Sequence, residues 1–118
     1  MSANYKDLIV WQRAMQLSQK SYEVTREFPA DEKFGLVSQI RRASVSVVSN
    51  IAEGQGRMTK GEFRQFLGHA RGSLFELETQ VLLAEQLGFV VRAKDVNAIC
   101  EMVEEVKKML NGLIKSLA

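Results

Sequence analysis

The sequence predicts an all-α fold, in which residues 1–118 form one domain, an up-down-up-down antiparallel four-helix bundle. First, apolar residues recur with the 3.6-residue helical period in four separate segments. Second, one proline and eight glycines leave few positions that would interrupt a helix. Third, the composition, with 46% apolar and 25% charged residues, is ordinary for a globular domain of this length with a buried core. Short loops between four long helices favour antiparallel neighbours, and a bundle follows.

The first helix is expected over about residues 8–27, with Asp7 as its N-cap. Polar side chains occupy one arc of roughly 140° around it, and apolar or small side chains occupy the rest. Pro29 ends this helix, because the residue before a proline is disfavoured in the helical region. Asp31 is then placed to cap the second helix.

The second helix is expected over about residues 31–53, and it is unusually poor in charge. Between Phe34 and Ala52 the only charged residues are Arg41 and Arg42. The VSVV run within it could form a strand, but the helical period holds over about five turns and no partner strand is evident. Gly54 and Gly56 follow, where a left-handed C-terminal cap favours glycine.

The third and fourth helices are expected over about residues 60–87 and 95–117. Thr59 and Glu62 form a capping-box pattern at the start of the third helix. Gly88 and Phe89 have the pattern of a C-terminal cap with its hydrophobic contact. The fourth segment carries one apolar stripe and one charged face, which is typical of an outer helix of a bundle.

Two helices have a second apolar or small face beyond the one that a bundle core needs. On the second helix the main face runs from Leu36 to Ile51, and on the third the core stripe runs from Phe63 to Ala84. The spare faces predict a subunit interface in a homo-oligomeric ring. Its candidate residues are Phe34, Val45, Ala52, Gly68, Gly72, Phe75, Thr79 and Leu82. The seven-residue line Arg64, Arg71, Glu78 and Glu85 could also pair with a symmetry-related copy.

Charge is unevenly distributed along the chain, although the net charge is only +2. Residues 33–72 hold seven Lys or Arg against two Glu, a net +5, whereas residues 73–118 hold five against seven acidic residues, a net −2. This asymmetry favours an anionic partner for the middle of the chain, or an acidic face of another subunit. The candidate nucleic-acid contacts are Arg41, Arg42, Arg57, Lys60, Arg64 and Arg71.

Two of these features have a structural alternative. Arginines within an otherwise uncharged helix require carboxylates, carbonyls or an outside anion. Arg41 and Arg42 could therefore pair with the third helix or with a neighbouring subunit, through residues such as Glu76 or Glu78, instead of phosphate. The loop over residues 54–57 and the start of the third helix could hold an anion. However, that loop follows a helix rather than a strand, which favours the explanation that its glycines cap the second helix and turn the chain.

Catalytic and metal-binding patterns are scarce. The only histidine is His69 and the only cysteine is Cys100, too few for a zinc site or a di-iron carboxylate bundle. His69 and Glu76 lie two turns apart on one side of the third helix, which favours a structural or interfacial pair. Cys100 lies at the edge of an apolar stripe and is expected to pack there. The sequence therefore predicts no metal, no cofactor and no enzymatic activity.

The expected location is the cytoplasm. A single cysteine fits a reducing compartment, and the N-terminus lacks the pattern of a secretory signal. No apolar run approaches the roughly 20 residues that span a bilayer, so no membrane partner is expected.

Four segments of the chain carry a resemblance to a known family. They are DLIVWQRA at 7–14, residues 28–57 with SNIAEGQGR, residues 63–80 with GSLFELET, and the pattern of the fourth helix. The chain resembles the small four-helix-bundle proteins encoded in intervening sequences of bacterial 23S ribosomal RNA genes. It is also similar to the accessory variability protein of diversity-generating retroelements, a pentameric bundle that binds nucleic acid and a reverse transcriptase through a basic surface. The resemblance implies the fold and a homopentameric ring.

These observations predict a non-enzymatic, oligomeric helical bundle that binds RNA or DNA or assists an assembly. The possible partners are a second copy of the chain, a nucleic acid, and a reverse transcriptase or another protein. The alternative is a protein-binding scaffold without nucleic-acid contact, and an enzyme ranks third. Neither composition nor resemblance predicts the biological process.

Overall fold

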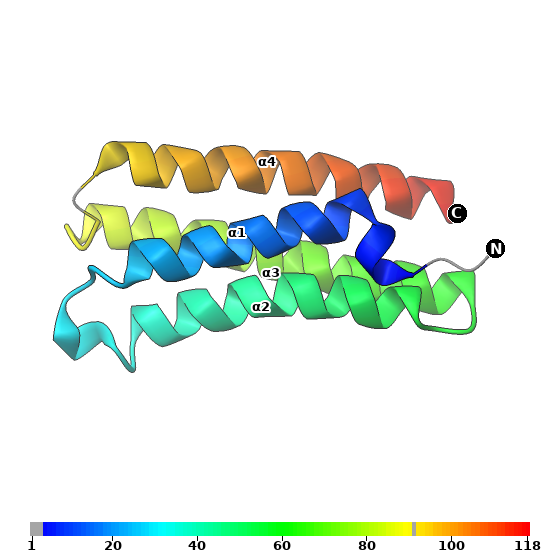
Figure 1. Cartoon of the computed structure of the whole chain (residues 1–118), viewed down its shortest axis with the longest axis horizontal. Helices are drawn as coiled ribbons and strands as arrows, with labels where there is room; N and C mark the ends of the chain where they lie inside the picture. Colours follow the sequence, from blue (N-terminus) through cyan, green and yellow to red (C-terminus); the bar gives the residue numbers. More distant parts are fainter. Residues whose placement is uncertain (1–3, 91) are drawn as a thin grey trace.

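The computed structural model describes residues 4–90 and 92–118, and within these ranges it contains helices and no strand. Each long helix runs antiparallel to the next one in the sequence (Figure 1). The molecule is elongated along the helix axes, with extents of 46 × 24 × 20 Å. The four long helices are α1 (Ile9–Thr25), α2 (Leu36–Gln55), α3 (Lys60–Gln86) and α4 (Ala93–Ser116). Two short 3-10 turns, η1 (Tyr5–Asp7) and η2 (Ala30–Glu32), precede α1 and α2. The predicted all-α four-helix fold is confirmed.

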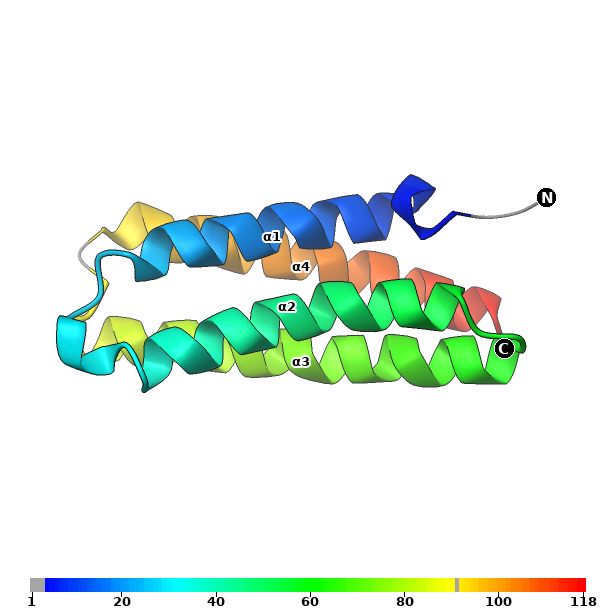
Figure 2. The same ribbon diagram turned by 60° about the horizontal axis from the view of Figure 1, so that its bottom comes forward.

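The core lies along the bundle axis, where one face of each helix is buried. Its completely buried side chains include Leu17 from α1, Ile40 from α2, Leu74 from α3 and Ile99 from α4. The helices α2 and α3 have the most extensive contact, and they lie side by side in both ribbon views (Figures 1 and 2). The VSVV run is helical, because packing of its apolar face against α1 and α3 outweighs weak local propensity.

The predicted N-caps of α1 and α2 are wrong. Asp7 lies inside η1. Leu8 is the N-cap residue of α1, and its side chain makes no capping hydrogen bond. Asp31 lies inside η2, so α2 starts at Leu36, later than expected. The neighbouring Glu32 takes over the capping role, because its Oε1 accepts a hydrogen bond of 3.1 Å from the N–H of Leu36.

The predicted caps of α3 are confirmed. The N–H of Glu62 donates to Thr59 Oγ1 at 3.1 Å, and the two side chains also hydrogen-bond. At the other end Gly88 has a φ of 79°, the N–H of Phe89 donates to Ala84 O, and the N–H of Gly88 donates to Glu85 O. These two bonds are the Schellman arrangement, which requires the left-handed glycine.

Gly54 and Gly56 do not form the left-handed cap that the sequence suggests. Gly56 has a φ of −82°, in the right-handed region, and its N–H donates to the carbonyls of Ala52 and Glu53. Gly54 is instead a buried residue of α2, and a Cβ there would lie 2.8 Å from Phe66 Cβ. The glycine at position 54 is therefore explained by the close approach of α3.

Candidate functional surfaces

A row of cations follows one face of α3, and we call Lys60, Arg64 and Arg71 the α3 basic stripe. All three side chains are exposed, and none forms an ion pair within the described part of the chain. Arg64 Nε donates to the carbonyl of Ile114 at 3.4 Å, which places it beside the end of α4. The stripe extends on the order of 16 Å along the helix. Three of the six predicted nucleic-acid contacts are thus brought together.

Aromatic rings lie beside the stripe. The Arg71 guanidinium lies 5.3 Å from the centre of the Phe75 ring, and the ammonium of Lys107 on α4 lies 5.7 Å from it. Arg57, in the turn before α3, lies 4.5 Å from the Phe66 ring and forms a 3.5 Å ion pair with Glu53. Arg57 is exposed but its charge is partly neutralised, unlike those of the stripe.

The expected partner of Arg41 is wrong, because this arginine turns toward α1 rather than toward a carboxylate of α3. Its Nε donates to Thr25 Oγ1 at 2.9 Å and its Nη2 to the carbonyl of Tyr22 at 3.4 Å. The guanidinium also lies 4.6 Å from the centre of the Tyr22 ring. Arg41 therefore joins α2 to α1 through neutral groups, and it lies away from the stripe.

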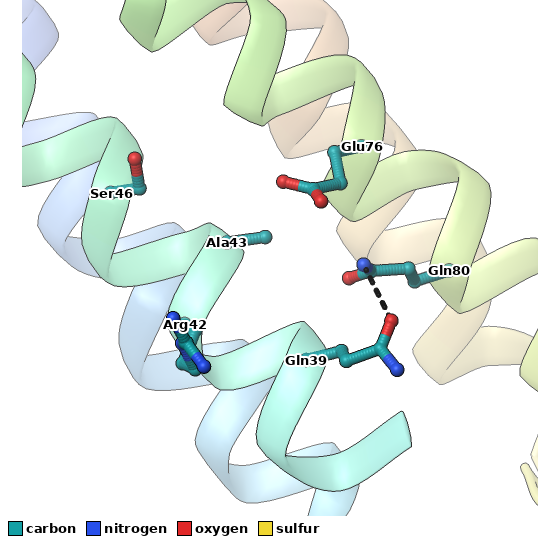
Figure 3. A pocket seen from close by; sticks show the side chains of 6 residues that line it. All are labelled: Gln39, Arg42, Ala43, Ser46, Glu76 and Gln80. Carbon is teal, nitrogen blue, oxygen red and sulfur yellow. Dashed lines mark hydrogen bonds between the residues drawn. The ribbon is translucent and has the colours of Figure 1, made fainter. Parts of the chain in front are cut away.

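Arg42 lines a polar groove between α2 and α3, which we call the α2–α3 groove. Its volume is about 350 Å³, and it is lined by Gln39, Arg42, Ala43, Ser46, Glu76 and Gln80. Figure 3 shows these side chains extending from the two helices, with the Gln80 amide donating to Gln39 Oε1 at 3.4 Å. Arg42 and Glu76 share the groove but form no ion pair with each other, so the pairing predicted for Arg42 within one chain is wrong, and its pairing with a neighbouring subunit stays a prediction.

The predicted interface residues on α3 share one exposed face. A Cβ at Gly68 or Gly72 would meet no heavy atom within 4 Å, so another chain could approach closely there. Phe75 and Leu82 are 38% and 39% exposed, and Thr79 is exposed with its hydroxyl bonded to the Phe75 carbonyl. This face overlaps the α3 basic stripe, so the two predicted uses of α3 compete for the same surface.

The predicted interface residues near α2 lie on a different surface. Phe34, before the helix, is 89% exposed, Val45 is 43% exposed and Ala52 is half-buried. The neighbouring Ser46 faces α3, because its hydroxyl bonds that of Ser73 at 2.8 Å. Since successive helical residues are about 100° apart, Val45 lies on the outer side of α2. The α2–α3 groove separates this surface from the exposed face of α3.

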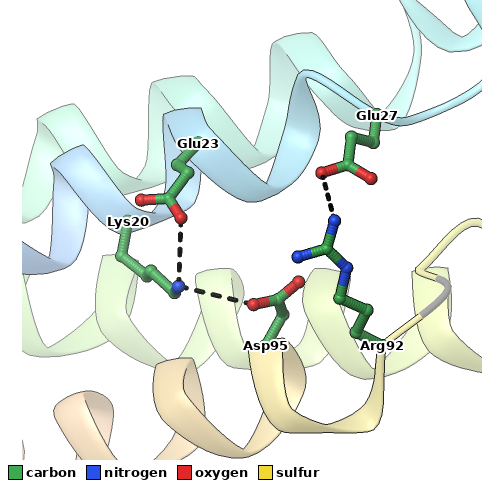
Figure 4. A network of polar contacts seen from close by, with 5 residues as sticks. All are labelled: Lys20, Glu23, Glu27, Arg92 and Asp95. Carbon is green, nitrogen blue, oxygen red and sulfur yellow. Dashed lines mark hydrogen bonds and ion pairs between the residues drawn. The ribbon is translucent and has the colours of Figure 1, made fainter.

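The interhelical ion pairs lie elsewhere, and within the described residues all of them connect the α1 and α4 sides of the bundle. Lys20 pairs with Asp95 at 3.4 Å and with Glu23 at 3.3 Å, and Arg92 pairs with Glu27 at 3.4 Å (Figure 4). We call these five residues the α1–α4 network. The hydrogen bond from Lys20 to Glu23 is the main cause of a raised Lys20 pKa, with Asp95 adding to it and burial opposing it.

His69 and Cys100, the two candidates for a catalytic or metal-binding role, make ordinary packing contacts. His69 is exposed and makes an edge contact of 5.9 Å with the Phe66 ring, and it forms no hydrogen bond to Glu76. Cys100 packs at the edge of the core as predicted, and burial raises the pKa of its thiol, with smaller contributions from Glu78 and Glu85. In the part of the chain that the structure describes, no three His, Cys, Asp or Glu side chains gather closely enough to hold a metal ion.

Sequence reasoning missed the polar contacts between helices. Gln39, Ser46, Ser73 and Gln80 face each other across α2 and α3, yet in the sequence they are ordinary polar residues between apolar positions. The only available signal was the polar stripe on the second helix that contains Gln39, Arg42 and Ser46.

Comparisons with known proteins agree with this fold. A family model described as 23S rRNA-intervening sequence protein matches residues 6–112. The chain belongs to this family. No curated protein sequence matches it. The fold is similar to the crystal structure, at 1.70 Å resolution, of a protein of unknown function from the S23 ribosomal protein family of Bacteroides thetaiotaomicron. That match has a TM-score of 0.83 and 20% identity, and it covers 91% of this chain and 99% of the other.

The family assignment applies to the whole bundle, since the matched residues begin in η1 and end in the last turns of α4. The structural neighbour supports the fold and has no assigned function. In the described ranges, none of the helices of this 23S rRNA-intervening sequence family member is both long and apolar enough to cross a membrane.

Proposed function

We propose that this family member is a non-enzymatic, self-associating helical bundle that binds RNA or DNA through the α3 basic stripe. The observation that carries the proposal is the state of Lys60, Arg64 and Arg71: three exposed cations on one helix face, without a carboxylate partner in the described structure. Cations that a protein does not neutralise itself attract phosphates and release counterions from nucleic acid on binding.

The aromatic ring of Phe75 supports a single-stranded nucleic acid over a duplex. Phe75 is partly exposed, and the Arg71 guanidinium and the Lys107 ammonium both lie near its ring, so a base could stack beside cations that contact its phosphates. Single-stranded binding surfaces combine such rings with a basic track and show little sequence preference. RNA with unpaired segments is therefore the preferred ligand in this proposal.

Self-association is proposed through two different surfaces. Exposed Phe34 and Val45 lie on the α2 side of the α2–α3 groove, and exposed Leu82 lies on α3 about two turns beyond Phe75, which is left to the nucleic acid. When one patch of a copy meets a different patch of the next copy, the contact is heterologous and closes into a ring if the rotation permits. This arrangement supports the homopentameric ring that the resemblance implies.

The nucleic-acid proposal is tested by fluorescence anisotropy with an unstructured 20-nucleotide RNA at salt concentrations from 50 to 200 mM. A variant with Lys60→Ala, Arg64→Ala and Arg71→Ala should bind at least about 10-fold more weakly, and the slope of log K against log salt should fall by about 2, as three lost single-strand phosphate contacts predict. A matched control with Arg26→Ala, Lys33→Ala and Lys94→Ala removes the same charge near the opposite end of α3. Equal losses in the two variants would refute the stripe as the binding surface.

The ring is tested by light scattering coupled to size-exclusion chromatography at micromolar protein. Val45→Glu should convert the oligomer into smaller species, because a charge would be buried at the α2 surface. Asn111→Glu, on the exposed face of α4, is the control and should leave the mass unchanged. A monomeric mass for the unmodified chain contradicts the proposal.

The exposed apolar surfaces also suit a scaffold that binds another protein. Capture of partners from cells, before and after nuclease treatment, separates the two functions. A scaffold retains its partner after the treatment, whereas partners held through nucleic acid are lost.

A further inference from the structure

The α2–α3 groove has the size of a site for a small molecule. Its volume of about 350 Å³ lies within the range of ligand pockets, which is roughly 300–1,000 Å³. The groove lies between α2 and α3, the two helices that pack most extensively. Near its base the hydroxyl of Ser46 bonds Ser73 and accepts from Asn50 Nδ2 at 3.1 Å, so this wall is already fixed by neighbours.

One wall contains a buried polar atom that lacks a partner. Gln80 is only 8% exposed, and its Oε1 has no hydrogen-bond partner, while its Nε2 donates to Gln39. Buried side-chain amides are almost always satisfied, so the unpaired amide oxygen in the α3 wall is a polar site that the described residues leave incomplete. A flip of a side-chain amide exchanges its O and N positions. If both the Gln39 and the Gln80 amides were flipped, Gln80 Nε2 would be the unpaired atom, so one polar atom of Gln80 lacks a partner in either case.

Two opposite charges complete the groove. Arg42 on α2 and Glu76 on α3 both line it, and neither forms an ion pair within the described residues. Figure 3 shows the Glu76 carboxylate directed from α3 toward α2, with the Gln80 amide one turn further along the same helix. The α2 wall therefore offers the hydrogen-bond donors of a guanidinium, and the α3 wall offers the acceptors of a carboxylate and an amide.

We infer that the α2–α3 groove binds a small zwitterion of the α-amino-acid class. The ligand carboxylate pairs with Arg42 and its ammonium donates to Glu76, and both of these residues are exposed. A lone anion would be repelled by Glu76 and a lone cation by Arg42, whereas a zwitterion satisfies both and leaves the groove neutral. The lining contains no aromatic ring on which a nucleobase could stack, which separates this site from the α3 basic stripe.

Isothermal titration calorimetry of the full chain with each of the 20 L-amino acids, up to 10 mM, tests the inference. At least one should bind saturably, and its analogues that lack either the carboxylate or the amine should bind at least 10-fold more weakly. Arg42→Met and Glu76→Gln should each weaken binding by 10-fold or more. Both residues are exposed, so the variants should remain folded, as circular dichroism would check.

The matched controls are Lys94→Met and Glu62→Gln, which make the same chemical changes outside the groove and should bind as the unmodified chain does. Absence of saturable binding for all 20 amino acids overturns the inference. Equal binding by the Arg42 and Glu76 variants, or by the singly charged analogues, overturns it as well.

Discussion

The α1–α4 network and the α3 basic stripe are two uses of similar side chains in one small bundle. In the network, Lys20 and Arg92 each have a carboxylate partner within 3.4 Å. In the stripe, Lys60, Arg64 and Arg71 have none in the described structure, although Glu62 lies only two positions from Lys60 and from Arg64 in the sequence. The difference indicates that the network charges join helices, whereas the stripe charges are available to a partner.

Reversing charge in the two regions should give the largest contrast. Arg64→Glu with Arg71→Glu replaces two attractive phosphate contacts by two repulsions, so RNA affinity should fall by about 100-fold or more in the anisotropy assay at 100 mM salt. Lys20→Glu with Arg92→Glu changes the net charge equally but acts within the α1–α4 network. Its RNA affinity should change by less than about threefold. A similar loss in both variants would show that net charge, not the stripe, determines binding.

Substitutions in the α1–α4 network should lower stability more than substitutions in the α3 basic stripe, the reverse of their order for RNA affinity. Lys20→Met removes the cation between Glu23 and Asp95, and the Lys20 and Asp95 side chains are only 22% and 16% exposed. We expect the free energy of unfolding in urea to fall by about 1 kcal/mol, near the upper end for pairs close to the surface. Arg71→Met should change it by less than about 0.5 kcal/mol, because surface substitutions have small effects. The comparison would fail if Arg71→Met were the more destabilising change.

The pH dependence of the unfolding free energy at alkaline pH is a finer test of the contribution of Lys20. The hydrogen bond to Glu23 raises the Lys20 pKa above its ordinary value of 10.5. A folded-state pKa above that of the unfolded chain means that this stabilisation is complete below the unfolded pKa and is lost as the pH rises through the folded one. Between pH 7 and 9 the unfolding free energy attributable to Lys20 should stay constant, and above about pH 10.5 it should decline. The Lys20→Met variant should lack that part of the decline.

The sequence predicted the helices and their buried faces because the 3.6-residue period is a local property of the chain. It also predicted the Thr59 and Gly88 caps, whose hydrogen bonds join residues only a few positions apart. It failed for Arg41, which bonds Thr25 and Tyr22, and it gave no indication of the Gln39–Gln80 contact. Such contacts depend on the rotation and register of two packed helices, which neither helix specifies alone. The sequence thus identified the stripe on α3 but not the groove beside α2.

The first half of α3 is basic, whereas its second half contains Glu78 and Glu85. The reactivity of Cys100 on α4 is a measure of the effect of these two carboxylates. Burial first, then Glu78 and Glu85, raises the pKa of its thiol above the ordinary value, so the reactive thiolate is scarcer at a given pH. At pH 8 we expect iodoacetamide to modify Cys100 more slowly than a cysteine in a short unstructured peptide. Glu78→Gln with Glu85→Gln should quicken the reaction modestly, by less than about threefold, because burial remains. Glu101→Gln with Glu104→Gln is the control, since these carboxylates line the neighbouring surface without raising that pKa. A larger acceleration in the control would locate the acidic influence on α4 instead of α3.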